Sequence, residues 1–113
     1  MTIIWHNPRC SKSRQTLALL QERGGEVKVR RYLDDAPSLD ELRAARDLLG
    51  LSAVEMMRVK EPAFAEAGLS KDDGDEALLA AMAAHPVLIE RPVVFANGKA
   101  ALGRPPEAVL AIL

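Results

Sequence analysis

Residues 3–14, which read IIWHNPRCSKSR, decide the fold of this chain. Their apolar start predicts a strand, and the apolar residues that recur from Thr16 to Leu20 predict a helix after the loop. Cys10 is therefore expected at or just before the N-terminus of a helix, where unpaired backbone N–H groups point outward. That position stabilises a thiolate, which is the reactive form of the cysteine side chain.

The chain contains a single cysteine. A lone cysteine is most often a small buried hydrophobic residue, but the flanks of Cys10 are polar, and Arg9, Lys12 and Arg14 add positive charge close to it. The surroundings thus favour a reactive cysteine over a core residue. Because no second thiol is present, an oxidised or adducted Cys10 has to be restored by a thiol from another molecule.

The composition is that of a small globular domain. A length of 113 residues suits one domain, and 49% hydrophobic with 27% charged residues is ordinary. A net charge of -1 gives no basic field to attract nucleic acid or a membrane surface, so neither is an expected partner. One cysteine and two distant histidines are too few for a structural zinc site, and we expect no metal. The single cysteine, with no signal-peptide pattern and no long apolar run, predicts the cytoplasm.

The first third of the chain predicts a parallel βαβ unit over residues 1–32. A short strand over 2–5 is followed by a helix that Ser11 or Ser13 would cap and that runs to about Arg23. Residues 27–32 alternate roughly between apolar and polar side chains, which is typical of a second strand.

A helical block follows, over about residues 38–85. Ser38 and Glu41 form a capping-box pattern that begins a helix ending near Leu49. Further helices are expected over 52–57, 62–67 and 73–84.

The last part, residues 92–113, predicts two strands and a helix. Asn97-Gly98 is a strong two-residue hairpin turn between strands over 92–95 and 99–102. Pro105-Pro106 would open a final helix with Val109, Leu110 and Leu113 facing inward. The order of elements indicates an α/β fold, and it is the order of a thioredoxin-like domain with a mixed four-stranded sheet and an enlarged helical insertion.

Cys10 and Ser13 form a Cys-x-x-Ser pattern, which lacks the resolving thiol of a dithiol enzyme. The Ser13 hydroxyl either donates a hydrogen bond to the thiolate, which favours the charged form, or caps the helix. His6 either lowers the thiol pKa as an imidazolium or orients the loop as a neutral ring. Asn7 and Pro8 are expected to shape the loop so that backbone amides converge on the cysteine.

Three arginines occupy informative places. Arg58 follows a predicted short helix, Arg91 precedes Pro92 at a strand start, and Arg104 precedes Pro105 at a strand-to-helix junction. A single arginine is usually a solvated surface charge, whereas three that converge on a thiolate would bind a tetrahedral oxyanion through their guanidinium forks. The Arg91–Pro92 bond is also a candidate for a cis peptide, because such bonds occur almost only before proline.

Together these motifs resemble one family, the glutaredoxin-coupled arsenate reductases, in their short form. The resemblance covers almost the whole chain and is strongest over residues 3–10, 85–94 and 103–107. A His-Asn-Pro-x-Cys segment combined with later Arg-Pro-Val-Val and Arg-Pro-Pro segments is far more specific than any one of them alone. The chain departs from the longer plasmid-type enzymes in that it stops at Leu113, without their C-terminal extension.

The resemblance implies a mechanism and a set of roles. Cys10 would be the nucleophile, and Arg58, Arg91 and Arg104 would be the anion-binding arginines. His6 would be the histidine that lowers the thiol pKa, and Ser13 the serine at the helix start. Arsenate would be reduced to arsenite through a Cys10 thiolate–arsenate adduct that glutathione and glutaredoxin resolve, with glutathione as co-substrate and no bound cofactor. A monomer is expected.

Two other functions fit the same fold. A regulator of the Spx type binds RNA polymerase, although that class commonly carries a Cys-x-x-Cys switch that Ser13 removes here. A monothiol glutaredoxin-like enzyme would act on another substrate, such as glutathionylated protein, and would need no selectivity for an oxyanion.

Overall fold

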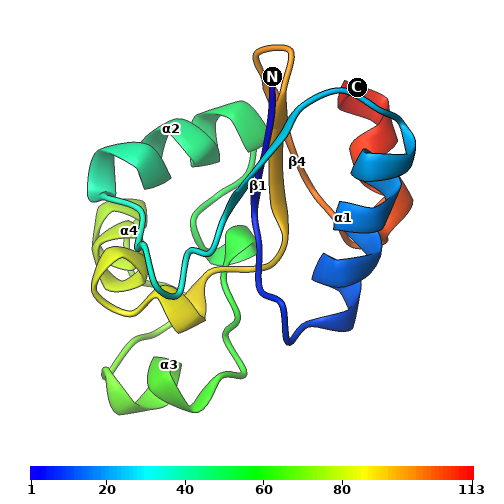
Figure 1. The fold of residues 1–113 in the computed structure, drawn as a ribbon. Coiled ribbons are helices and arrows are strands. Elements are labelled where there is room, and N and C mark those ends of the chain that lie inside the picture. The colour runs from blue at the N-terminus through cyan, green and yellow to red at the C-terminus, as the bar shows by residue number, and fades with distance from the viewer. The chain divides into compact units, whose positions relative to one another are not determined.

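The computed structural model describes residues 1–113, which form four strands, four α-helices and three 3₁₀ segments (Figure 1). The strands are β1 (Thr2–Trp5), β2 (Val27–Arg30), β3 (Val93–Ala96) and β4 (Lys99–Leu102). The α-helices are α1 (Ser11–Glu22), α2 (Leu39–Leu49), α3 (Pro62–Glu66) and α4 (Asp75–Ala84). The 3₁₀ segments are η1 (Val54–Met56), η2 (Pro86–Leu88) and η3 (Pro106–Ile112). No helix is both long and apolar enough to span a membrane.

The chain divides into two compact units. One contains Met1–Asp35 and Arg91–Leu113, and the other contains Ala36–Glu90. The second unit corresponds closely to the helical insertion that the sequence predicted over about residues 38–85. A single thioredoxin-like domain over the whole chain stays a prediction.

The four strands form one mixed sheet in the order β2-β1-β3-β4. β1 is parallel to β2 and antiparallel to β3, and β3 pairs with β4 in a hairpin. Trp5, the last residue of β1, pairs with Arg30 on one side and with Val93 on the other. The loop after β1 therefore leaves the sheet between the end of β2 and the start of β3. This register confirms the predicted thioredoxin-like, mixed four-stranded sheet.

Two helical segments cover one face of the sheet. α1 and η3 pack on each other and lie side by side on that face (Figure 1). The apolar core between them and the sheet consists of Ile4, Leu20, Val94, Ala96, Val109 and Ile112. Each fully buried large aliphatic side chain contributes about 1.5 to 3 kcal/mol, so this cluster holds α1 against the strands through Leu20.

The second unit is mainly helical, with one isolated antiparallel bridge between Met57 and Ile89. α2 packs on α4, and Leu42, Leu78 and Leu79 are almost completely buried. The predicted capping box at the start of α2 is present: the Ser38 hydroxyl accepts a hydrogen bond from the Glu41 N–H, and the Ser38 N–H donates to the Glu41 carboxylate.

Two local details of the first unit differ from the predictions. β2 ends at Arg30 and not at residue 32, because a turn begins there in which the N–H groups of Asp34 and Asp35 donate to the Arg31 carbonyl. α1 begins with Cys10 as its N-cap and has no side-chain cap, so neither Ser11 nor Ser13 caps it.

The last helical segment is a 3₁₀ helix. Its buried residues Pro106, Val109 and Ile112 recur every three positions, which is the period of a 3₁₀ helix. Leu113 is 41% exposed, so its predicted inward position was wrong. α4 begins at Asp75 and not at residue 73.

Candidate active site

The reactive loop joins β1 to α1 and places Cys10 at the helix N-terminus. The N–H of Cys10 donates to the Asn7 carbonyl at 3.0 Å, and the Cys10 carbonyl accepts from the Arg14 N–H at 3.0 Å as α1 begins. The Asn7 side chain accepts a hydrogen bond from the Arg9 N–H at 3.0 Å, as in an Asx turn. The loop is thus a tight turn with the cysteine as its last residue.

A buried polar contact holds this loop against the first turn of α1. The Ser13 hydroxyl lies 2.7 Å from Nδ1 of His6 and accepts a hydrogen bond from the Asn7 N–H at 3.0 Å. His6 is 6% exposed and Ser13 is fully buried. Of the two possibilities for His6, these contacts favour loop orientation. The Ser13 hydroxyl contacts the loop at His6 and Asn7, which is neither the thiolate hydrogen bond nor the helix cap expected of it. Ser13 lies within the first turn of α1 and acts as a tether between helix and loop.

The pKa of the Cys10 thiol lies below its ordinary value. Burial acts to raise the pKa, but hydrogen bonding from the Ser13 backbone N–H, the positive charge of Arg91 and the Lys12 backbone N–H together outweigh it. A hydrogen bond from the Arg91 side chain lowers it further. The sulfur is therefore stabilised as a thiolate by the helix N-terminus and one guanidinium, as expected for a nucleophilic cysteine.

Burial lowers the pKa of His6, and the positive charges of Arg31 and Arg14 lower it further. A histidine with a lowered pKa is mainly neutral near pH 7. A neutral ring supplies no positive charge to the thiolate, so the geometry does not favour the role that the resemblance assigns to His6, that of lowering the thiol pKa. The helix amides and Arg91 fill that role.

The structure places Arg91 beside the cysteine and Arg104 next to the Arg91 backbone. Arg91 interacts with Cys10, and Nη1 of Arg104 donates to the Arg91 carbonyl at 3.3 Å. The peptide bond before Pro92 is cis, and so is the bond between Arg104 and Pro105, which we had not anticipated. Two guanidinium groups thus belong to loops that adjoin the start of α1.

Arg58 belongs to the second unit, Ala36–Glu90, which we call the helical unit. Its guanidinium pairs with Glu61 at 3.0 Å and donates to the Val87 carbonyl at 3.5 Å, and its side chain is 25% exposed. Its assignment to an anion site stays a prediction based on the resemblance.

Sequence reasoning missed two residues that position this site, Gly103 and Thr16. A Cβ atom on Gly103 would lie 2.4 Å from Oγ1 of Thr16 and 2.6 Å from Cγ of Pro92. The Gly103 N–H donates to the Pro92 carbonyl at 3.0 Å. Only glycine leaves room for α1, the Pro92 loop and the Arg104 loop to meet. The signal that the sequence offered for this position was a small residue between two functional loops.

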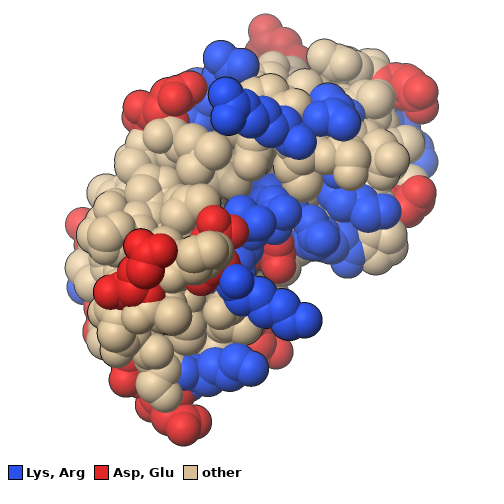
Figure 2. All heavy atoms as spheres, turned by 90° about the horizontal axis from the view of Figure 1, so that it is seen from below, with Lys and Arg blue, Asp and Glu red and all other residues tan.

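The charge around the reactive loop is mostly positive. Figure 2 shows the molecule from the side on which α1 begins, and Lys and Arg side chains gather there. No group of three or more His, Cys, Asp or Glu side chains is arranged to hold a metal ion. A thiolate at a helix N-terminus beside the Arg91 guanidinium can attack an electrophile that carries negative charge.

The fold and this site define a thioredoxin-like protein with one activated cysteine. The model of the ArsC family matches residues 5–112, and the chain belongs to that family.

Several relatives are similar over nearly their whole length. An arsenate reductase of Neisseria meningitidis serogroup A is 55% identical over 112 residues, which cover 97% of this chain and 96% of that protein. An arsenate reductase of Haemophilus influenzae is 45% identical over 113 residues, covering 98% and 97%. Among solved structures, an arsenate reductase from Vibrio cholerae has a TM-score of 0.95 at 52% identity and covers 99% of this chain and 97% of that one.

Proposed function

We propose that this protein reduces arsenate to arsenite and that Cys10 is the nucleophile. The observation that carries the proposal is the Cys10 thiol, whose pKa is lowered at a helix N-terminus beside Arg91. Family membership and the arsenate reductases among its relatives support arsenate as the substrate.

Arsenate is a tetrahedral oxyanion, and the two clustered arginines match its chemistry. Arg91, which adjoins the sulfur, and Arg104, which donates to the Arg91 backbone, offer guanidinium groups to its oxygens. These groups neutralise negative charge that would otherwise repel a thiolate. Arg58 joins this proposed set on the resemblance alone.

The first chemical step is attack by the Cys10 thiolate on arsenic. An S–As bond forms, and one arsenate oxygen leaves as water after protonation. Arsenic remains pentavalent in this adduct, so no electrons have yet been transferred.

Reduction requires a second thiol, and the chain has no second cysteine. We propose that glutathione attacks the adduct and displaces a second oxygen as water. An S–S bond then forms between Cys10 and glutathione while arsenic leaves as arsenite. The two sulfur atoms supply the two electrons that arsenic gains. A glutaredoxin then restores the Cys10 thiol by thiol–disulfide exchange, and the glutathione pool of the cytoplasm would sustain the cycle.

The test is arsenate-dependent NADPH oxidation with glutathione, glutaredoxin and glutathione reductase present. The wild-type protein should turn over, and Cys10→Ser should not, while its circular dichroism stays that of a folded protein. Turnover that continues in Cys10→Ser, or that is unaffected by omitting glutaredoxin, would contradict the scheme.

The anion site is tested in the same assay with Arg91→Ala. Loss of a guanidinium that contacts the substrate should raise the KM for arsenate by about tenfold or more. Arg23→Ala serves as the matched control, because Arg23 is an exposed arginine of the same unit at the far end of α1. Equal KM values for the two variants would argue against the anion site.

A further inference from the structure

A charged pocket lies on the flank of the reactive loop away from Arg91. It has a volume of about 340 Å³ and is lined by His6, Asn7, Pro8, Arg9, Arg31, Leu33 and Asp34. This volume falls within the range of about 300 to 1,000 Å³ that is usual for small-molecule sites. Neither Arg91 nor Arg104 lines it.

The register of the sheet explains why the loop has two flanks. β1 lies between β2 and β3, so the loop after β1 adjoins the turn that follows β2 on one side and the start of β3 on the other. The β3 side carries Arg91, and the β2 side carries Arg31 and Asp34. The tight turn that ends at Cys10 forms a wall of the pocket, because Asn7, whose carbonyl accepts from the Cys10 N–H, is a lining residue.

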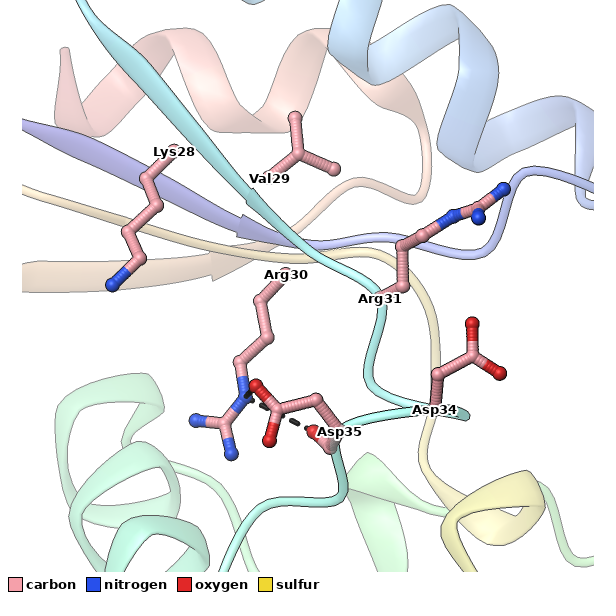
Figure 3. Close-up of a pocket in the computed structure, with 6 residues that line it drawn as sticks. All are labelled: Lys28, Val29, Arg30, Arg31, Asp34 and Asp35. Carbon is pink, nitrogen blue, oxygen red and sulfur yellow. Dashed lines mark hydrogen bonds and ion pairs between the residues drawn. The ribbon is translucent and has the colours of Figure 1, made fainter.

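The charges of the pocket specify the kind of ligand that it fits. Arg9 and Arg31 each carry a positive charge, Asp34 carries a negative charge, and Leu33 adds an apolar wall that is 43% exposed. Figure 3 draws a neighbouring pocket that shares Arg31 and Asp34 with this one; its dashed lines join Arg30 to Asp35, and none joins Arg31 to Asp34. The charges that complement this set are two carboxylates and one ammonium group.

We propose that this pocket binds the low-molecular-weight thiol that resolves Cys10, and that it selects a peptide thiol with two carboxylates and one ammonium group. Arg31 and Arg9 bind the carboxylates, and Asp34 binds the ammonium group. Glutathione has this combination of charges. The inference rests on the proposed function for the identity of the reaction, but the binding preference can be measured without arsenate.

The experiment follows the reaction of Cys10 with two disulfides by mass spectrometry. The Cys10 thiolate attacks one sulfur of the disulfide, a mixed disulfide forms, and the other half leaves as a thiolate. One probe is oxidised glutathione, and the other is bis(2-hydroxyethyl) disulfide, which is uncharged. The ratio of the two rate constants is the measured quantity, because a change in the reactivity of the sulfur itself affects both probes and cancels.

Arg31→Gln should lower this ratio by about tenfold, since it removes a guanidinium–carboxylate contact. Lys28→Gln is the matched control: Lys28 is an exposed residue of β2 that does not line this pocket, and its loss should change the ratio less than about twofold. Equal ratios in Arg31→Gln and Lys28→Gln would overturn the proposal.

Asp34→Asn separates a specific pocket from a general positive field. A field alone predicts that removing a negative charge increases the ratio, because oxidised glutathione carries net negative charge. The pocket predicts a decrease of about two- to threefold, because the ammonium group loses its partner. An increase in the ratio would overturn the proposal.

Kinetics with arsenate separate this inference from the proposed function. In Arg31→Gln the KM for glutathione should rise while the KM for arsenate stays unchanged. A wild-type protein without arsenate turnover would contradict the proposed function and would leave the disulfide ratios interpretable. Normal turnover with unchanged ratios would contradict the pocket alone.

Discussion

The reactive loop and the surface of the helical unit both depend on polar contacts, but these contacts lie in opposite environments. His6 is 6% exposed and Ser13 is fully buried where they contact each other. In the helical unit, Arg43 pairs with Glu76 at 2.9 Å, yet the two side chains are 39% and 61% exposed. A buried polar group that loses its partner is left without water, whereas an exposed one is solvated at once. The loop should therefore be far more sensitive to substitution than the ion pairs.

The largest expected effect is that of Gly103→Ala. Its Cβ atom would come within 3.0 Å of both Thr16 and Pro92, so α1 or the neighbouring loops have to move. We expect a loss of about 3 kcal/mol in the free energy of unfolding, measured with urea. Gly74→Ala is the counterpart in the helical unit, because a Cβ there meets nothing within 4 Å. It should cost less than about 1 kcal/mol, because Gly74 is the N-cap of α4, where alanine is less favoured than glycine. Equal losses in the two variants would contradict this account of Gly103.

The second effect is that of Ser13→Ala, which leaves the Asn7 N–H and the His6 ring without their shared partner. The expected loss is about 2 kcal/mol in the free energy of unfolding. Ser38→Ala, at the exposed cap of α2, removes one hydrogen bond to the Glu41 N–H and should cost about 1 kcal/mol. A smaller loss for Ser13 than for Ser38 would show that burial is not what distinguishes the two regions.

How much the sequence could predict depends on how local each pattern is. Patterns that depend on neighbouring residues were reliable: the capping box of Ser38 is present, and so is the Asn97-Gly98 turn, with positive φ at both residues. The final helix was predicted with a period of 3.6, but its buried residues recur every three positions. The two patterns differ by only about 0.6 residue per turn. Short apolar segments do not distinguish these periods.

The candidate site was predictable only in part for a similar reason. Cys10 at a helix N-terminus follows from local order along the chain, and the structure agrees. Whether His6 acts through charge or orientation depends on burial and on Arg31 and Arg14, which come close only after folding. The contact of Gly103 with Thr16 joins residues far apart in the sequence, and no local pattern contains it.

A third prediction concerns the dependence of stability on pH. Burial, with the charges of Arg31 and Arg14, lowers the pKa of His6 in the folded protein from 6.5. The unfolded chain therefore binds a proton more readily than the folded protein in the window below pH 6.5. The stabilising contribution is complete above that pH and decreases as the pH falls toward the folded-state pKa.

The difference in unfolding free energy between wild type and His6→Gln isolates this contribution. It should shrink steadily as the pH is lowered below 6.5. His85→Gln, which removes the exposed histidine of the helical unit, is the control variant. A difference that is constant across this window would mean that the protonation of His6 is not linked to folding.

The smallest effect is expected for the ion pair between Arg43 of α2 and Glu76 of α4. Exposed charges gain little from pairing, because water already solvates them and ordering two long side chains opposes the attraction. In a double-mutant cycle with Arg43→Gln and Glu76→Gln, the coupling energy should be smaller than the loss caused by Ser13→Ala. It should decrease further in about 1 M NaCl, where the screening length is about 3 Å. The Ser13 effect should be nearly independent of salt, because its contacts are between buried neutral groups. A coupling energy that matches the Ser13 loss and persists in salt would place both contacts in one class and remove the contrast between the two regions.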